Sequence, residues 1–186
     1  RTLKLMSFNS CDLPKLGKVD KRMKLAQIKL YMIQNGINIS MLQGTKSKSG
    51  QSDWILQGGE GFVLVQHGKV GGGANGVALL FDRWTYEAYA RARADMGKKA
   101  VVKLEKNGRW LGIHLVFLTD KGTKDRVFVV VSYAPCKEGP EMVEWRSMFA
   151  KYQKEKLENE LIIFAADTNS KMGISDGADD PVLGPF

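Results

Sequence analysis

Asp167 and Asn169, with one residue between them, follow the apolar run Leu161–Ala166. The run predicts a strand, and alternation along a strand places the two side chains on the same side of it. Metal-dependent cleavage of phosphoesters needs hard oxygen ligands, usually carboxylates and amides gathered at strand ends. The pair is therefore a candidate for part of a phosphoester-cleaving site, with an Asx-type turn after the strand as the structural alternative.

Polar residues also follow other predicted strands. Asn9 ends the run Leu3–Phe8, Gln43 ends Ile37–Gln43, and Tyr133 follows a nearly continuous apolar stretch. Strand ends suit a site because the sheet holds the side chains rigidly while the site opens to solvent. The alternatives are local: Asn9 as the cap of a turn, and Tyr133 as an amphipathic residue at a sheet edge.

The remaining elements follow from hydrophobic periodicity and from turn residues. Further strands are expected at Phe62–Gln66, Gly76–Phe81, Ala100–Glu105, Trp110–Leu118 and Val127–Ala134, and helices at Met23–Gln34 and Pro140–Glu158. The chain thus begins β-α-β, continues with strands of antiparallel type, and closes α-β. This order predicts an α/β fold with two sheets packed face to face and helices outside.

Five motifs in this order resemble the endonuclease/exonuclease/phosphatase family. They are LMSFNS, ISMLQGTKS, NGVALLF, VVVSYAP and IIFAADTNSKMG, and they span nearly the whole chain. Within the family the similarity is greatest to the endonuclease domains of non-LTR (LINE-type) retrotransposons. The resemblance implies a two-sheet α/β sandwich forming a single domain over residues 1–186, and Mg²⁺ or Mn²⁺ as the cofactor of an active member.

The resemblance also implies roles for four residues. Asn9 matches the asparagine that helps to hold the metal and the phosphate, and Tyr133 the residue that contacts the scissile phosphate. Asp167 matches the aspartate that orients or deprotonates the attacking water. Asn169 matches an asparagine that contacts the phosphate. Together these residues form the candidate catalytic site.

Two departures from the family pattern argue against catalysis. The metal-binding glutamate should follow Gln43, but the chain has Gly44, which offers no ligand to a divalent cation. The closing blocks of the family, with an Asp-His pair, would lie beyond Phe186, so the fold is expected to be incomplete at its C-terminus. The two histidines, His67 and His114, are expected to be structural or surface residues.

These departures predict a degenerate, catalytically inactive member of the fold that serves as a structural subunit or binding module in a larger assembly. No cofactor is then expected. The alternative is an active Mg²⁺-dependent DNA endonuclease, if the missing C-terminal part is supplied. A phosphatase acting on a small substrate would need the same glutamate and histidine.

The charge of the chain favours polyanionic partners. Its 186 residues include 28 Lys and Arg against 20 Asp and Glu, a formal net charge of +8. The resemblance places basic loops at the rim of the expected site, where they would contact nucleic acid, and solvated surface charge is the alternative. The candidates are Lys15, Lys18, Lys21, Lys46 and Lys48. The expected partner is therefore nucleic acid, DNA rather than RNA by the resemblance, or a larger protein assembly.

Two further features bear on location. No apolar run approaches the roughly 20 residues of a membrane span, and Cys11 and Cys136 lack the spacing of a zinc site. An intracellular setting is expected, with the nucleus favoured for a nuclease-like protein. The start at Arg1 rather than Met leaves an organelle open.

Overall fold

The computed structural model describes residues 2–10, 19–46, 54–55, 61–69, 75–137 and 139–168. Within the first helix the side chains are described from residue 24 onward, and at 54–55 only the backbone is described. No helix in these ranges is long and apolar enough to cross a membrane.

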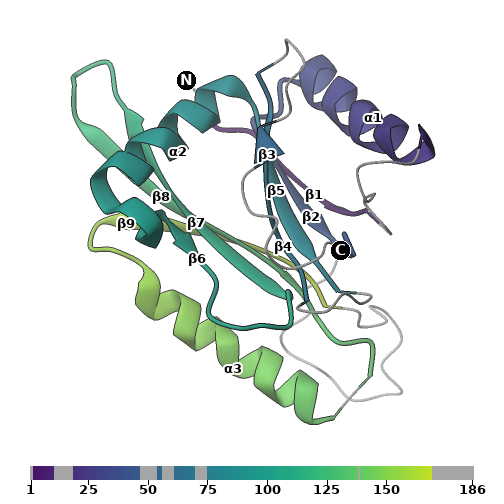
Figure 1. Ribbon diagram of the computed structural model, residues 1–186. Coiled ribbons are helices and arrows are strands. Elements are labelled where there is room, and N and C mark those ends of the chain that lie inside the picture. Colours follow the sequence, from purple (N-terminus) through teal and green to yellow (C-terminus); the bar gives the residue numbers. More distant parts are fainter. Residues whose placement is uncertain are drawn as a thin grey trace, which may run out of the picture.

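Two mixed β-sheets pack face to face, with one helix on the outer side of each sheet and a further helix that contributes Ala88 and Tyr89 to the core between them (Figure 1). The first sheet has the order β1-β2-β5-β4-β3, with β1 at Leu5–Asn9, β2 at Ile39–Gln43, β3 at Trp54–Ile55, β4 at Val63–His67 and β5 at Val77–Phe81. The second has the order β6-β7-β8-β9, with β6 at Val101–Val102, β7 at Trp110–Leu118, β8 at Lys124–Tyr133 and β9 at Glu160–Asp167. The α/β sandwich predicted from the sequence is confirmed.

Parallel pairing occurs once in each sheet, and a helix makes each crossover. β1 and β2 are parallel and are joined by α1 (Val19–Asn35), while β8 and β9 are parallel and are joined by α3 (Pro140–Glu155). The other strand pairs are antiparallel. A parallel connection needs such a crossover because the chain must return to the same end of the sheet.

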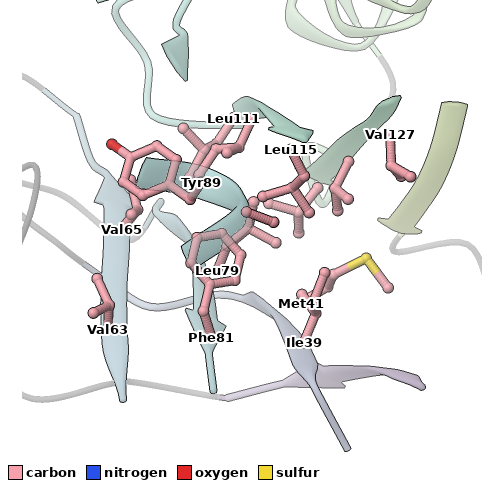
Figure 2. Close-up of a cluster of buried hydrophobic side chains, with 14 of the residues drawn as sticks. Ile39, Met41, Val63, Val65, Leu79, Phe81, Tyr89, Leu111, Leu115 and Val127 are labelled. Carbon is pink, nitrogen blue, oxygen red and sulfur yellow. The ribbon is translucent and has the colours of Figure 1, made fainter. Parts of the chain in front are cut away.

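The main core lies between the sheets and is filled by alternate residues of the strands (Figure 2). Each apolar side chain buried there contributes about 1.5–3 kcal/mol to folding. The residues of opposite parity face the helices. In the first sheet Leu42, Leu64 and Leu80 pack on Leu25 and Ile28 of α1. The second sheet meets α3 through a separate cluster that includes Trp110, Phe128, Met148 and Tyr152.

One helix was not predicted. Residues Arg83–Met96 form α2, followed by a 3-10 turn at Gly97–Ala100, in a stretch where no element was expected. The Asp82 carboxylate caps the helix by accepting a hydrogen bond of 2.8 Å from the Thr85 backbone N–H. The buried face of α2 consists of Thr85, Ala88, Tyr89 and Ala92. This face has helical spacing, but apart from Tyr89 it consists of alanine and threonine, so the overall hydrophobicity of the stretch is low.

Several predicted boundaries were wrong. The strand expected at Ala100–Glu105 is only β6, because Ala100 belongs to the 3-10 turn and the chain leaves the sheet after Val102. The third helix ends at Glu155 rather than Glu158, since the chain turns before β9. Helix α1 begins before Met23, and the two-residue strand β3 was not expected.

A buried acid–histidine pair joins β7 to the start of β9. The Nδ1 atom of His114 lies 2.8 Å from Oε1 of Glu160, and the side chains are only 2% and 1% exposed. Glu160 Oε2 also accepts a hydrogen bond of 2.8 Å from the Leu157 backbone N–H, which fixes the turn that leads into β9. The ring of His114 stacks on Phe128 at a centroid distance of 4.3 Å. The expected structural role of His114 fits these contacts.

We expect Glu160→Leu to lower the free energy of unfolding by about 3 kcal/mol, because it leaves His114 buried without its partner. The double variant His114→Leu/Glu160→Leu should lose less than the sum of the two single variants. Urea denaturation measures both quantities. Glu158→Leu, an exposed position in the same turn, is the control. A loss at Glu160 no larger than at Glu158 would show that the pair is dispensable.

Candidate functional site

The carboxyl ends of β1, β2, β8 and β9 meet at one end of the sandwich. Asn9 is in register with Gln43, and Tyr133 is in register with Asp167. Asn9 is four residues from Leu5, and Asp167 is four residues from Ile163, and both apolar residues pack on the core between the sheets. Strand alternation therefore directs Asn9 and Asp167 into the gap between the sheets at its open end.

Asn9 and Asp167 contact each other across that gap. The Asn9 Nδ2 donates a hydrogen bond of 2.5 Å to Asp167 Oδ2, between residues 158 positions apart in the chain. Tyr133 is partly buried against the same core, on the strand next to Asp167. The structure thus brings three of the four candidate catalytic residues to one end of the sandwich, while Asn169 lies outside the described residues. Their catalytic roles stay predictions.

The candidate nucleic-acid residues are described only in part. Lys46 is exposed and follows the corner after β2. Lys21 lies in the first turns of α1, but its side chain is outside the described part of the structure. Lys15, Lys18 and Lys48 also lie outside the described residues.

The corner after β2 is built around a glycine. Gly44 has a φ of 63°, a left-handed conformation that residues with a side chain adopt at a cost. The next residue, Thr45, is fully buried, and its backbone N–H donates to the carbonyl of Gly76 at 3.0 Å. The position where the resemblance places a metal-binding glutamate therefore lacks a carboxylate and also has a backbone conformation suited to glycine.

The side chains described at this end of the sandwich do not form a suitable ligand set for a divalent cation. Asp167 is the one carboxylate among the described terminal residues of β1, β2, β8 and β9, and it already accepts a hydrogen bond from Asn9. Nowhere in the described ranges do three or more His, Cys, Asp or Glu side chains gather as metal ligands. Mg²⁺ is usually bound through one or two carboxylates together with waters and substrate phosphates. We therefore derive no step through a metal.

A buried carboxylate at this end was missed at the sequence level. Glu105 accepts backbone hydrogen bonds from Asn107, from Arg109 at 2.8 Å and from Trp110 at 3.1 Å. Its Oε1 also lies 3.4 Å from Nε2 of His67, at the end of β4. The segment EKNGRW reads as a hairpin turn, and no turn signal in it indicates that the glutamate folds back onto the turn. His67 is thus held by a specific partner rather than lying in a loop.

These contacts set the pKa of Glu105. Burial alone would raise it, but the hydrogen bond and charge of His67, together with the backbone N–H groups of Arg109 and Trp110, hold the pKa below its ordinary value of 4.5. The ionised carboxylate is therefore the form that organises the turn.

Comparison with known proteins identifies the architecture. No family profile matches the sequence, and no curated protein matches it. Among solved structures, an AP endonuclease from Leishmania major aligns over 89% of this chain and 54% of its own, with a TM-score of 0.61 and 17% identity. TDP2 of D. rerio, complexed with a single-strand DNA product, aligns over 91% of this chain and 61% of its own, with a TM-score of 0.51 and 13% identity.

An endonuclease/exonuclease/phosphatase family protein from Leptotrichia buccalis also matches, over 91% of this chain and 67% of its own, with a TM-score of 0.51 and 11% identity. The chain has the endonuclease/exonuclease/phosphatase fold. At these identities the likeness concerns the fold alone. The chain spans a little over half the length of the first two of these structures.

In this fold the Glu105 turn should stabilise the site end in a pH-dependent way. Because the folded-state pKa is lowered, the stabilisation is complete above pH 4.5 and is lost as the pH falls through the lower folded-state value. Glu105→Gln should therefore lower the free energy of unfolding by about 2 kcal/mol at pH 7. The difference in this free energy between the variant and the wild type should become smaller below pH 4.5. Urea denaturation over a pH series measures this. A cost that is independent of pH would contradict the assignment.

The Gly44 corner makes a separate prediction. Gly44→Ala should lower the free energy of unfolding by about 1 kcal/mol or more, because alanine is strained at positive φ. Gly44→Asn should cost less, since asparagine tolerates this conformation better. Thermal and urea unfolding of the two variants provide the comparison. An alanine variant as stable as the wild type would show that the corner does not require glycine.

Proposed function

We propose that the chain is a nucleic-acid-binding domain of the endonuclease/exonuclease/phosphatase fold that has lost phosphoester cleavage. The observation that carries the proposal is the site end itself, where Asn9 and Asp167 are in contact but Gly44 replaces the expected metal-binding carboxylate. The domain would extend over residues 1–186 and derive from an ancestor of the LINE-type retrotransposon endonucleases.

The chemistry supports loss of activity. Metal-assisted hydrolysis requires a cation to neutralise charge on the phosphate and a general base to activate water. A general acid or base alone contributes about 10²–10⁴ in rate. Asp167 remains as a candidate for orienting water, but among the described residues it has no second carboxylate at the neighbouring strand ends. A site with only one of these components would cleave a phosphodiester very slowly.

Charge and fold support nucleic acid as the partner. The net charge of +8 favours a polyanion, and one structural neighbour is a complex with single-strand DNA. Lys46 is exposed near the site end, where the basic loops of the sequence would add positive charge. DNA is the proposed ligand, bound as part of a larger assembly in the nucleus or in an organelle.

A second candidate function is Mg²⁺-dependent DNA endonuclease activity. The Asn9–Asp167 contact favours it, because both residues match catalytic positions of the family and Asn9 Nδ2 lies 2.5 Å from Asp167 Oδ2. The missing carboxylate and histidine would then have to come from residues outside the described ranges or from a partner chain.

The two functions predict opposite results in one pair of assays. We expect no nicking of supercoiled plasmid or of abasic-site DNA in Mg²⁺ or Mn²⁺, but a DNA mobility shift that weakens steeply with salt. Asp167→Ala is the control that separates intrinsic cleavage from a contaminating nuclease. Metal-dependent nicking that disappears in Asp167→Ala would overturn the proposed loss of activity. Absence of any shift at low salt would overturn nucleic-acid binding.

A further inference from the structure

Arg109 is a cation at the site end that the sequence-based candidates did not include. It stands directly before β7, and its carbonyl accepts a hydrogen bond of 2.9 Å from the Tyr133 backbone N–H. Its guanidinium lies 6.0 Å from the centroid of the Tyr133 ring, and Nη1 lies 3.4 Å from the Tyr133 carbonyl. Tyr133 is in register with Asp167, so Arg109 belongs to the same end of the sandwich as the Asn9–Asp167 contact.

The backbone that carries Arg109 is firmly held. Glu105 accepts hydrogen bonds from the N–H groups of Asn107, Arg109 and Trp110, and His67 lies against the same carboxylate. The guanidinium is therefore positioned in advance by a turn that is anchored to both sheets. A group held in this way loses little conformational freedom when it binds a ligand.

The counter-ion of Arg109 is held loosely by comparison. Arg109 Nη2 lies 3.2 Å from Oε2 of Glu141, in the first turn of α3. The Arg109 side chain is only 12% exposed, whereas the Glu141 side chain is 68% exposed. Because the Glu141 carboxylate is already largely hydrated, it loses little on leaving the ion pair, whereas the more buried Arg109 then requires another anion. Glu141 can therefore turn into solvent at small cost while Arg109 stays in place.

We propose that Arg109 binds a phosphate of a polynucleotide backbone, and that Glu141 is the counter-ion that this phosphate displaces. The proposal rests on the proposed nucleic-acid binding and assigns a residue to it. A guanidinium suits this role because its planar donors match two phosphate oxygens at once. Glu144, which lines the small cleft beside Arg109 together with Glu141, and the buried Glu105 are the other carboxylates near the group.

The chain provides a matched control pair far from this end. Arg83 and Glu87 form an Arg–Glu contact of 3.6 Å at the start of α2, with side chains 84% and 51% exposed. Arg83 follows β5, whose end at Phe81 is in register with Ile39, the first residue of β2. This pair therefore lies at the opposite end of the first sheet from Asn9. Replacing either arginine by glutamine changes the net charge by the same amount, and so does replacing either glutamate.

The experiment measures binding of the purified chain to a fluorescein-labelled oligothymidylate by fluorescence anisotropy, over about 50–200 mM salt. Arg109→Gln should weaken binding by about five- to tenfold, and the slope of log K against log salt should fall by about 0.7, the value for one lost phosphate contact on a single strand. Glu141→Gln should strengthen binding several-fold. Arg83→Gln and Glu87→Gln should produce smaller changes.

Each other outcome overturns the proposal in a recognisable way. Equal effects of Arg109→Gln and Arg83→Gln would show that Arg109 contributes only through the net charge of the chain. Weaker binding in Glu141→Gln would show that the ion pair supports the site rather than competing with the ligand. Glu141 is exposed, so this variant remains informative if Arg109→Gln does not fold. If the wild type binds DNA and Arg109→Gln binds equally well, nucleic-acid binding is supported but the role of Arg109 is rejected. If the wild type does not bind, both proposals are rejected.

Discussion

The parallel pairing of two strand pairs is the constraint on which the site end depends. β1 with β2 and β8 with β9 each run in one direction, because α1 and α3 return the chain across the outer faces (Figure 1). Four carboxyl ends are thereby brought to one end of the sandwich. Strand alternation then turns Asn9 and Asp167 inward at the same level, which allows a direct contact between residues from opposite ends of the sequence.

At the end of the sandwich that holds Asn9 and Asp167, the charged side chains have hydrogen-bond or ion-pair partners. Asp167 accepts from Asn9, Glu105 is surrounded by His67 and three backbone N–H groups, and Arg109 faces Glu141. Buried charge requires such partners, since an unpaired one would cost several kcal/mol. Glu105 is the buried carboxylate of the three, whereas the Asn9–Asp167 contact is exposed and the Glu141 side chain is 68% exposed. An incoming anion would therefore exchange with Glu141 before it disturbed the buried groups.

The Gly44 corner shows how one position can differ within a shared fold. Five ordered motifs and the observed sandwich both point to the endonuclease/exonuclease/phosphatase fold. The backbone at Gly44, with its φ of 63°, has a conformation that suits a residue without a side chain. A fold is maintained by many core contacts, whereas metal-dependent cleavage requires a few ligands in the right places. A change at one position can therefore affect the chemistry of a fold without affecting its architecture.

The sequence alone determined the order of most strands, two of the three helices in the described part of the chain and the candidate residues at the strand ends, because periodicity and turn residues are local signals. Only the tertiary structure revealed α2, whose buried face consists of alanine and threonine apart from Tyr89 and whose overall hydrophobicity is low. It also decided the partners of Glu160, Glu105 and Arg109. Those contacts join residues distant in the chain, so they depend on sheet register and helix packing, which no local pattern specifies.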